Sequence, residues 1–179
     1  MNDQTPALFL SHARQFLAGE YLPKIEKCLG SLTEQDVWWR SNEESNSIGN
    51  LLLHLSGNAR QWIVSGLGGS ADHRQRQTEF DERSLISKEQ LLARLQETLA
   101  EVDKVLAEFD PDNLTKPYKI QNLDVTALEA IFHVVEHFSM HTGQVIMLTK
   151  ILAKKDMKFY DFSSGKPVYT WQAADKSEE

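Results

Sequence analysis

The sequence predicts an all-α fold, an up-down four-helix bundle with an irregular C-terminal tail. Apolar residues recur at spacings of three and four along four long stretches, which is the period of an amphipathic helix. Polar loops with turn residues separate these stretches, as in a bundle. The composition, 41% hydrophobic and 25% charged over 179 residues, suits one core, so we expect residues 1–179 to form a single domain.

Charge and cysteine content exclude several classes of protein. The 19 Lys and Arg residues are outnumbered by 26 Asp and Glu residues, and no basic run stands out, so we expect no binding to nucleic acid. There is no basic leader and no stretch of about 18 apolar residues, which predicts a cytoplasmic protein without a membrane segment. The single cysteine, Cys28, cannot form an internal disulfide, and we expect it to fill apolar space.

The first predicted helix begins at Thr5 and Pro6, a capping hydroxyl followed by a residue suited to the first turn. Gly30 predicts its end, and Pro23 should kink it or split it in two. Its predicted apolar face consists of Leu10, Phe16, Leu17, Leu22, Ile25 and Leu29.

The second predicted helix lies within residues 46–70 and has two different faces. One is apolar: Ile48, Leu52, Leu55, Ala59, Trp62 and Ile63. The other is polar but uncharged: Asn50, His54, Gly57, Asn58 and Gln61. Arg60 is the only charged residue of the stretch, whereas a solvated face normally contains Lys and Glu. The neutral polar face therefore indicates a protected cleft that includes His54.

Residues 71–86 are polar and charged, and we expect a solvated loop between helices. The alternative is a lid whose arginines hold an anionic substrate. A third helix should begin at Ser87, where Gln90 completes a capping box, and end near Asp110. Residues 116–122 predict only an extended connector.

The fourth predicted helix runs from a capping box at Thr126 and Glu129 to about Ala153. It contains the segment HVVEHFSMHTGQ, in which His137 and His141 are four residues apart and share a helix face. His133 lies two turns from His141, about 12 Å along the axis, which is too far for one ion to bind all three.

These positions predict a metal site. Two histidines at this spacing provide half of one, and His54 is the candidate third ligand from a neighbouring helix. Three neutral nitrogens suit zinc or nickel and leave a coordination position open for water or substrate. Glu136 projects away from His141, which argues against it as a ligand.

The tail after residue 153 loses helical periodicity. Its aromatic residues alternate loosely around Gly165 and Pro167. This pattern fits a hairpin, or a segment that packs across the bundle or against a partner subunit.

The chain resembles the DinB/YfiT-like superfamily over nearly its whole length. The resemblance rests on a histidine within NSIGNLLLHLSGN, a later HxxxHxGQ and the stretch WWR. It implies a four-helix bundle, often dimeric, with a divalent metal held by His54, His137 and His141 and with His133 as a neighbour. Glu136 departs from the family pattern, because relatives often have Asn there.

The resemblance also implies a range of activities. Relatives act as thiol S-transferases or thiol-dependent isomerases, and others are named metal-dependent hydrolases. We therefore expect a low-molecular-weight thiol as partner, S-transferase-like chemistry on a small electrophile, and a homodimer. Asn58, Arg60 and Gln144 are candidates for orienting the ligands or binding the thiol's carboxylates. Hydrolysis at the same ion, or metal or partner binding without catalysis, remain alternatives, and no catalytic residue is identified.

Overall fold

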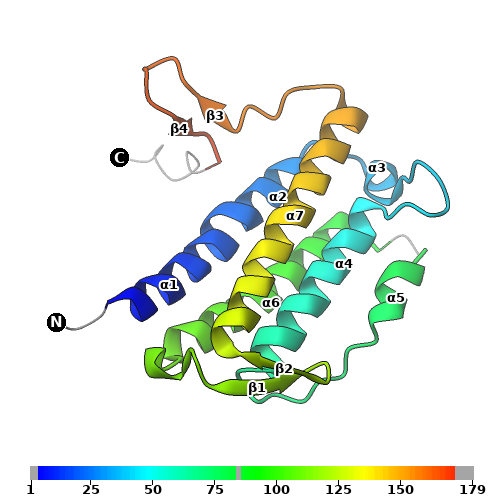
Figure 1. The fold of residues 1–179 in the computed structure, drawn as a ribbon. Coiled ribbons are helices and arrows are strands. Elements are labelled where there is room, and N and C mark those ends of the chain that lie inside the picture. Colours follow the sequence, from blue (N-terminus) through cyan, green and yellow to red (C-terminus); the bar gives the residue numbers. More distant parts are fainter. Residues whose placement is uncertain (1–3, 84–85, 172–179) are drawn as a thin grey trace.

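The computed structural model describes residues 4–83 and 86–171, and this part of the chain is mostly helical (Figure 1). The long helical segments are α1 (Thr5–Arg14) continued by η1 (Gln15–Tyr21) and α2 (Leu22–Leu29), α4 (Ile48–Ala59) continued by η2 (Arg60–Ser65), α6 (Lys88–Glu108) and α7 (Ala127–Ala153). The short elements are α3 (Glu34–Trp38), α5 (Arg76–Asp81), η3 (Pro111–Asn113), and the strands β1 (Pro117–Ile120), β2 (Leu123–Thr126), β3 (Tyr160–Asp161) and β4 (Val168–Tyr169).

Local sequence signals explain most helix starts. The predicted capping boxes at Ser87 and Thr126 are both present. A capping box that we did not predict starts α4, where the Ser47 hydroxyl accepts the Asn50 N–H and the Asn50 side chain accepts the Ser47 N–H. Thr5 is not the cap of α1, because the helix already begins at Thr5 and Gln4 occupies the cap position.

The first helical segment changes its hydrogen-bonding pattern where a break was predicted. A π-helical segment, η1, precedes α2, and Pro23 lies in the first turn of α2, where its missing N–H is tolerated. Phe16 does not join the core as predicted. It is 39% exposed and stacks on Tyr21, with ring centroids 5.9 Å apart.

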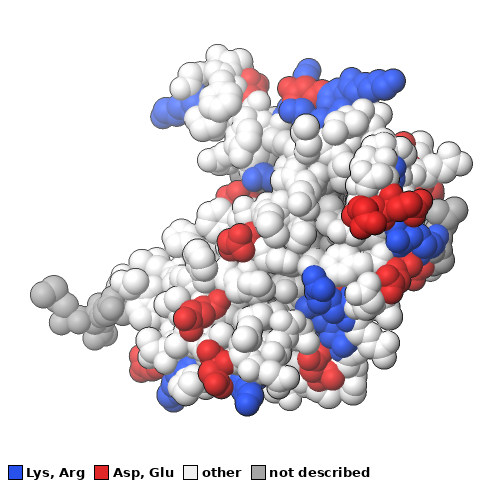
Figure 2. All heavy atoms as spheres, turned by 45° about the vertical axis from the view of Figure 1, so that its right-hand side comes forward, with Lys and Arg blue, Asp and Glu red and all other residues white. Residues whose placement is uncertain are grey.

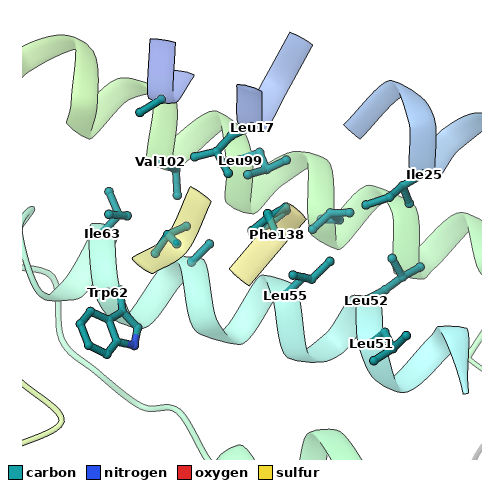
Figure 3. Packing of buried hydrophobic residues seen from close by; sticks show 14 of the residues in the cluster. Leu17, Ile25, Leu51, Leu52, Leu55, Trp62, Ile63, Leu99, Val102 and Phe138 are labelled. Atoms are coloured by element: carbon teal, nitrogen blue, oxygen red, sulfur yellow. The ribbon is translucent and has the colours of Figure 1, made fainter. Parts of the chain in front are cut away.

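The core forms where the long helices lie along one another, as α4 packs against α6 and α7 and α2 packs against α7 (Figure 1). Figure 3 shows Leu52, Leu55, Ile63, Leu99 and Phe138 converging between these helices. Phe138 is fully buried, so its replacement by alanine should cost about 3–5 kcal/mol of stability. This packing holds α4 and α7, which contain the predicted ligands, in fixed positions relative to each other.

Two short hairpins complete the described part of the chain. The predicted extended connector is instead the antiparallel pair β1–β2, whose turn places Gln121 and Asn122 at φ 52° and 62°. The tail forms the pair β3–β4. Trp171, which follows β4, is buried and lies under Lys24 of α2, with Nζ 4.2 Å from the ring centroid.

Among the described residues, none of the helices has both the length and the apolar composition that crossing a membrane requires.

Candidate metal centre

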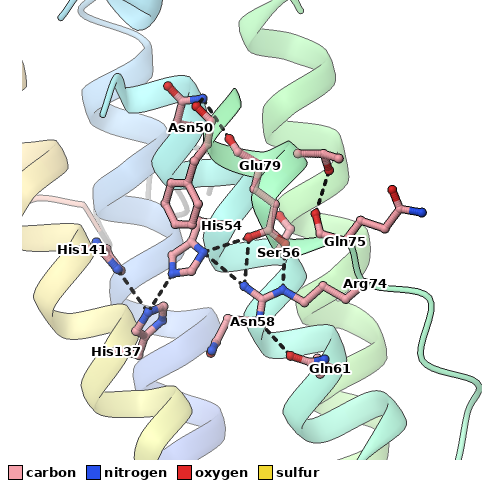
Figure 4. Close-up of polar contacts among 12 residues, drawn as sticks. Asn50, His54, Ser56, Asn58, Gln61, Arg74, Gln75, Glu79, His137 and His141 are labelled. Carbon is pink, nitrogen blue, oxygen red and sulfur yellow. Dashed lines mark hydrogen bonds and ion pairs between the residues drawn. The ribbon is translucent and has the colours of Figure 1, made fainter. Parts of the chain in front are cut away.

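The three predicted ligands meet between α4 and α7. His54 Nε2 and His141 Nε2 each lie 3.1 Å from His137 Nε2 (Figure 4). One ligand atom from each residue lies within 4.8 Å of the other two. All three residues are buried, with 5–9% of their surface exposed. The structure therefore contains a cluster of three imidazoles that could hold a metal ion.

Helix geometry accounts for this convergence. His137 and His141 are one turn apart on the face of α7 that meets α4. His54 lies in the middle of α4, every residue of which is buried, because α3, α5, α6 and α7 all pack against this helix. The polar face of α4 therefore looks toward α5 and α7 rather than toward solvent, as its lack of charge predicted.

A buried ion pair orients His54. Its Nδ1–H donates to Glu79 Oε2 at 2.8 Å, and Glu79 is only 6% exposed. Arg74 donates to the same carboxylate from Nε at 2.7 Å and from Nη2 at 2.9 Å. Arg74 Nη2 also lies 3.1 Å from His54 Nδ1, but both nitrogens are donors and both use Glu79 Oε2 as acceptor. A carboxylate on the distal nitrogen of a histidine is the usual arrangement that fixes a metal-binding imidazole.

Gly57 makes room for this ion pair. It lies one turn after His54 on α4, and a Cβ there would be 2.9 Å from Glu79 Cδ and 3.0 Å from Arg74 Nε. Any larger residue would push the carboxylate away from His54.

Gln144 bonds to the ring of His141, whereas the buried Nδ1 of His137 has no hydrogen-bond partner among the described residues. His141 Nδ1–H donates to Gln144 Oε1 at 2.7 Å, so Gln144 is placed to orient this ring. A neutral ring that donates from Nδ1 in this way, at His54 or at His141, presents an unprotonated Nε2 toward His137 Nε2. A proton on His137 Nε2 could be donated to only one of these two nitrogens, so the other nitrogen would have no hydrogen-bond donor. A divalent cation would accept all three lone pairs, and the residues therefore fit a metal.

Burial favours the neutral form of His137 and His141. It lowers the pKa of His137 to about 3, and the nearby His141 and His54 add to the shift. Burial also lowers the pKa of His141, against the opposing effect of its bond to Gln144. For Glu79, burial would raise the pKa, but the hydrogen bonds from Arg74 and His54 outweigh it and lower the pKa. At neutral pH the cluster thus contains neutral His137 and His141 rings, and the Glu79 carboxylate nearby is ionised.

The remaining candidates lie in different places. His133 is a neighbour of the cluster and not part of it, with its ring 5.4 Å from that of His137 and 4.2 Å from that of Trp62. Asn58 contacts His133, with Nδ2 3.2 Å from Nε2. Arg60 donates to Glu101 at 2.6 and 2.9 Å and does not line the cleft beside the histidines.

An open cleft of ≈ 470 Å³ leads to the three histidines. Its other lining residues are Asn46, Arg76, Gln77, Phe80 and Met140. None of the lining residues is acidic, and Arg76 stacks over Phe80 at 4.8 Å. A small molecule can therefore approach the imidazoles from this side.

The prediction of a solvated loop over residues 71–86 was wrong in part. Residues 76–81 form α5, which packs on α4 and buries Glu79. The charged residues of this segment gave no indication that Glu79 is buried, because one of the partners that stabilise its carboxylate, His54, lies in another helix. The one local signal was Phe80, the only aromatic residue among these charged ones.

Comparison with known proteins identifies the family of this chain but no activity. No curated protein matches it. The crystal structure of a conserved protein from Enterococcus faecalis is similar, with a TM-score of 0.64 and 16% sequence identity over 85% of this chain and 97% of that one, and this likeness shows a shared fold alone. A family model described as "Protein of unknown function (DUF1572)" matches residues 4–166, so the chain belongs to the DUF1572 family.

Proposed function

We propose that this protein is a metal-dependent enzyme whose divalent ion is bound by His54, His137 and His141. The observation that supports this most directly is the convergence of three imidazoles at one end of an open cleft, one of them oriented by a buried carboxylate. The donor set suits zinc or nickel.

We also propose that DUF1572 proteins of this type are relatives of the DinB/YfiT-like superfamily. The motif HxxxHxGQ supplies two of the three clustered histidines and the glutamine that orients one of them. The side-by-side packing of α1–α2, α4, α6 and α7 supports the four-helix bundle that this relationship requires. The assignment is ours and rests on these residues.

The chemistry that fits the cleft best is thiol-dependent transfer. A bound divalent ion would supply a Lewis acid that lowers the pKa of a thiol at its open position. The carboxylate that reaches the cluster, Glu79, is already bonded to His54 and Arg74, and none of the residues lining the cleft is acidic. Hydrolysis would benefit from a general base that this cleft does not offer, whereas a thiol activated by a cation needs none.

The side chains around the cleft indicate the kind of substrate. Phe80 and Met140 offer an apolar surface for a small electrophile, and Arg76 lies over Phe80 at the same opening. His54, His137 and His141 would hold the ion, Glu79 and Gln144 would keep two of the rings in place, and the tight packing of α4 against α7 would keep the geometry fixed.

Metal analysis of untagged protein tests the site. We expect one equivalent of zinc or nickel in the wild type and in His12→Ala, a matched substitution on the exposed face of α1, and none in His137→Ala. Equal metal content in all three proteins would refute the site. Turnover of a chlorinated nitrobenzene that requires both metal and an added thiol would then establish the enzyme, and a stoichiometric metal without turnover would leave a binding protein.

We further propose that the protein forms a homodimer through α7. Leu128, Phe132, Met147 and Ile151 of this helix are 41–61% exposed. Figure 2 shows charged side chains scattered over the face it draws, with uncharged surface between them. Light scattering should give twice the mass of one chain for the wild type, and a monomer for Phe132→Glu; a wild-type monomer would refute the proposal.

A further inference from the structure

A second cavity lies behind the ion pair that orients His54. It measures ≈ 370 Å³, within the range of small-molecule sites. Arg74 and Glu79 line it, whereas His54, His137 and His141 line the cleft on the other side of this pair. The Arg74–Glu79 ion pair thus separates this cavity from the cleft, and a molecule bound in the cavity would not contact the proposed metal ion.

Guanidinium groups reach this cavity from separate elements. Arg60 comes from η2, Arg74 from the segment before α5, and Arg94 from α6. This concentration stands out in a chain with a formal net charge of −7. Ser65, Gln75 and Thr78 add hydrogen-bonding groups to the lining.

Both acidic residues of the lining already accept hydrogen bonds within the protein. Glu79 accepts hydrogen bonds from Arg74 and His54. Asp72 accepts from Gln61 Nε2 at 2.6 Å and from the Arg74 backbone N–H at 3.0 Å. Glu79 is therefore paired with the Arg74 guanidinium, whereas Asp72 keeps its charge beside neutral donors, and the lining contains a further positive charge besides Arg60 and Arg74.

Arg94 is that further charge. Its guanidinium makes no hydrogen bond or ion pair with any described residue, and Arg60 shares its charge with Glu101, which does not line this cavity. We propose that the cavity is a binding site for a small anion bearing a phosphate or carboxylate group, held chiefly by Arg94 and Arg60. Arginine matches both groups because its planar donors can bond two oxygens at once. The proposal goes beyond the metal site and does not depend on it.

Titration of metal-stripped, desalted protein tests this assignment, because no ion is then present to bind the added anion. Inorganic phosphate and succinate would be added at constant ionic strength while amide shifts are followed by ¹H–¹⁵N NMR. We expect saturable shifts at Ser65, Gln75 and Thr78. Saturation by phosphate alone would indicate a phosphorylated ligand, and saturation by succinate alone a carboxylate ligand.

Two charge-matched variants on α6 sharpen the test. Arg94→Gln should weaken binding by about ten-fold, the effect of losing one charged hydrogen-bonding partner. Lys104→Gln removes the same charge from the same helix about 15 Å away and should leave the affinity within about two-fold of the wild type. Shifts that chloride reproduces, shifts that do not saturate, or equal affinity in Arg94→Gln would overturn the proposal. Loss of metal in His137→Ala with the titration unchanged would separate this site from the metal centre.

Discussion

The substitution Glu79→Gln tests the role of the buried carboxylate most directly. The change preserves the shape of the side chain but removes the charge that accepts the His54 Nδ1–H at 2.8 Å. Loss of the partner that orients a metal-binding histidine typically lowers metal affinity by about 10–100-fold. Competition with a chromophoric zinc chelator measures this change.

The same substitution should also lower stability. The Arg74 side chain is 5% exposed and would lose its buried carboxylate partner, Glu79. Removing one partner of a buried ion pair lowers the free energy of unfolding by about 3–5 kcal/mol, and urea denaturation of the metal-free protein would measure this loss. The double variant Glu79→Gln, Arg74→Met removes both charges, so it should regain much of that stability while metal affinity stays low.

Asp81→Asn is the matched control for this experiment. It makes the same change from acid to amide on α5 at an exposed position whose partner is Gln77. Its metal affinity and stability should equal those of the wild type within about 0.5 kcal/mol. Wild-type zinc affinity in Glu79→Gln would show that the carboxylate does not support the site, and our reasoning about the ion pair would be wrong.

Three further changes probe the same centre. Gly57→Ala should lower the free energy of unfolding by about 1–3 kcal/mol and weaken metal binding, because its Cβ would meet the Arg74–Glu79 pair. Gly143→Ala is the control: nothing lies within 4 Å of its Cβ, so it should be neutral or stabilising by up to about 1 kcal/mol. Thermal denaturation compares the two variants, and equal effects would contradict the packing argument. The metal-free protein should lose stability as the pH falls from about 6.5 toward 3, because His137 is protonated near pH 6.5 in the unfolded chain but has a pKa of about 3 in the folded protein. Denaturation at pH 7 and pH 5 measures this loss, and His137→Ala should flatten the pH dependence. A wild-type stability that rises on acidification would refute the prediction. Removal of the metal with a chelator should lower the melting temperature, since free metal at 100 times its Kd adds about 2.7 kcal/mol to the folded state; an unchanged melting temperature in the presence and absence of zinc would count against the site.

Features set by neighbouring residues were predicted correctly from the sequence. Helical periodicity located the long helices, and two capping boxes gave the starts of α6 and α7. The spacing of His137 and His141 placed them on one face, because an α-helix repeats every 3.6 residues wherever it occurs. The uncharged polar face of α4 correctly indicated that His54 is enclosed, since a solvated helix has little reason to exclude Lys and Glu.

The surroundings of the histidines were decided by tertiary structure alone. Arg74 and Glu79 lie in a charged segment that resembled a solvated loop, and their burial depends on His54, 25 residues before Glu79, and on the space left by Gly57. Arg60 looked close to His54 along the helix, yet it pairs with Glu101 of α6, 41 residues away. A periodic pattern records which side of a helix is apolar. Whether a charge is buried depends on the free energy it gains from partners distant in the chain, and only the folded arrangement determines which partners those are.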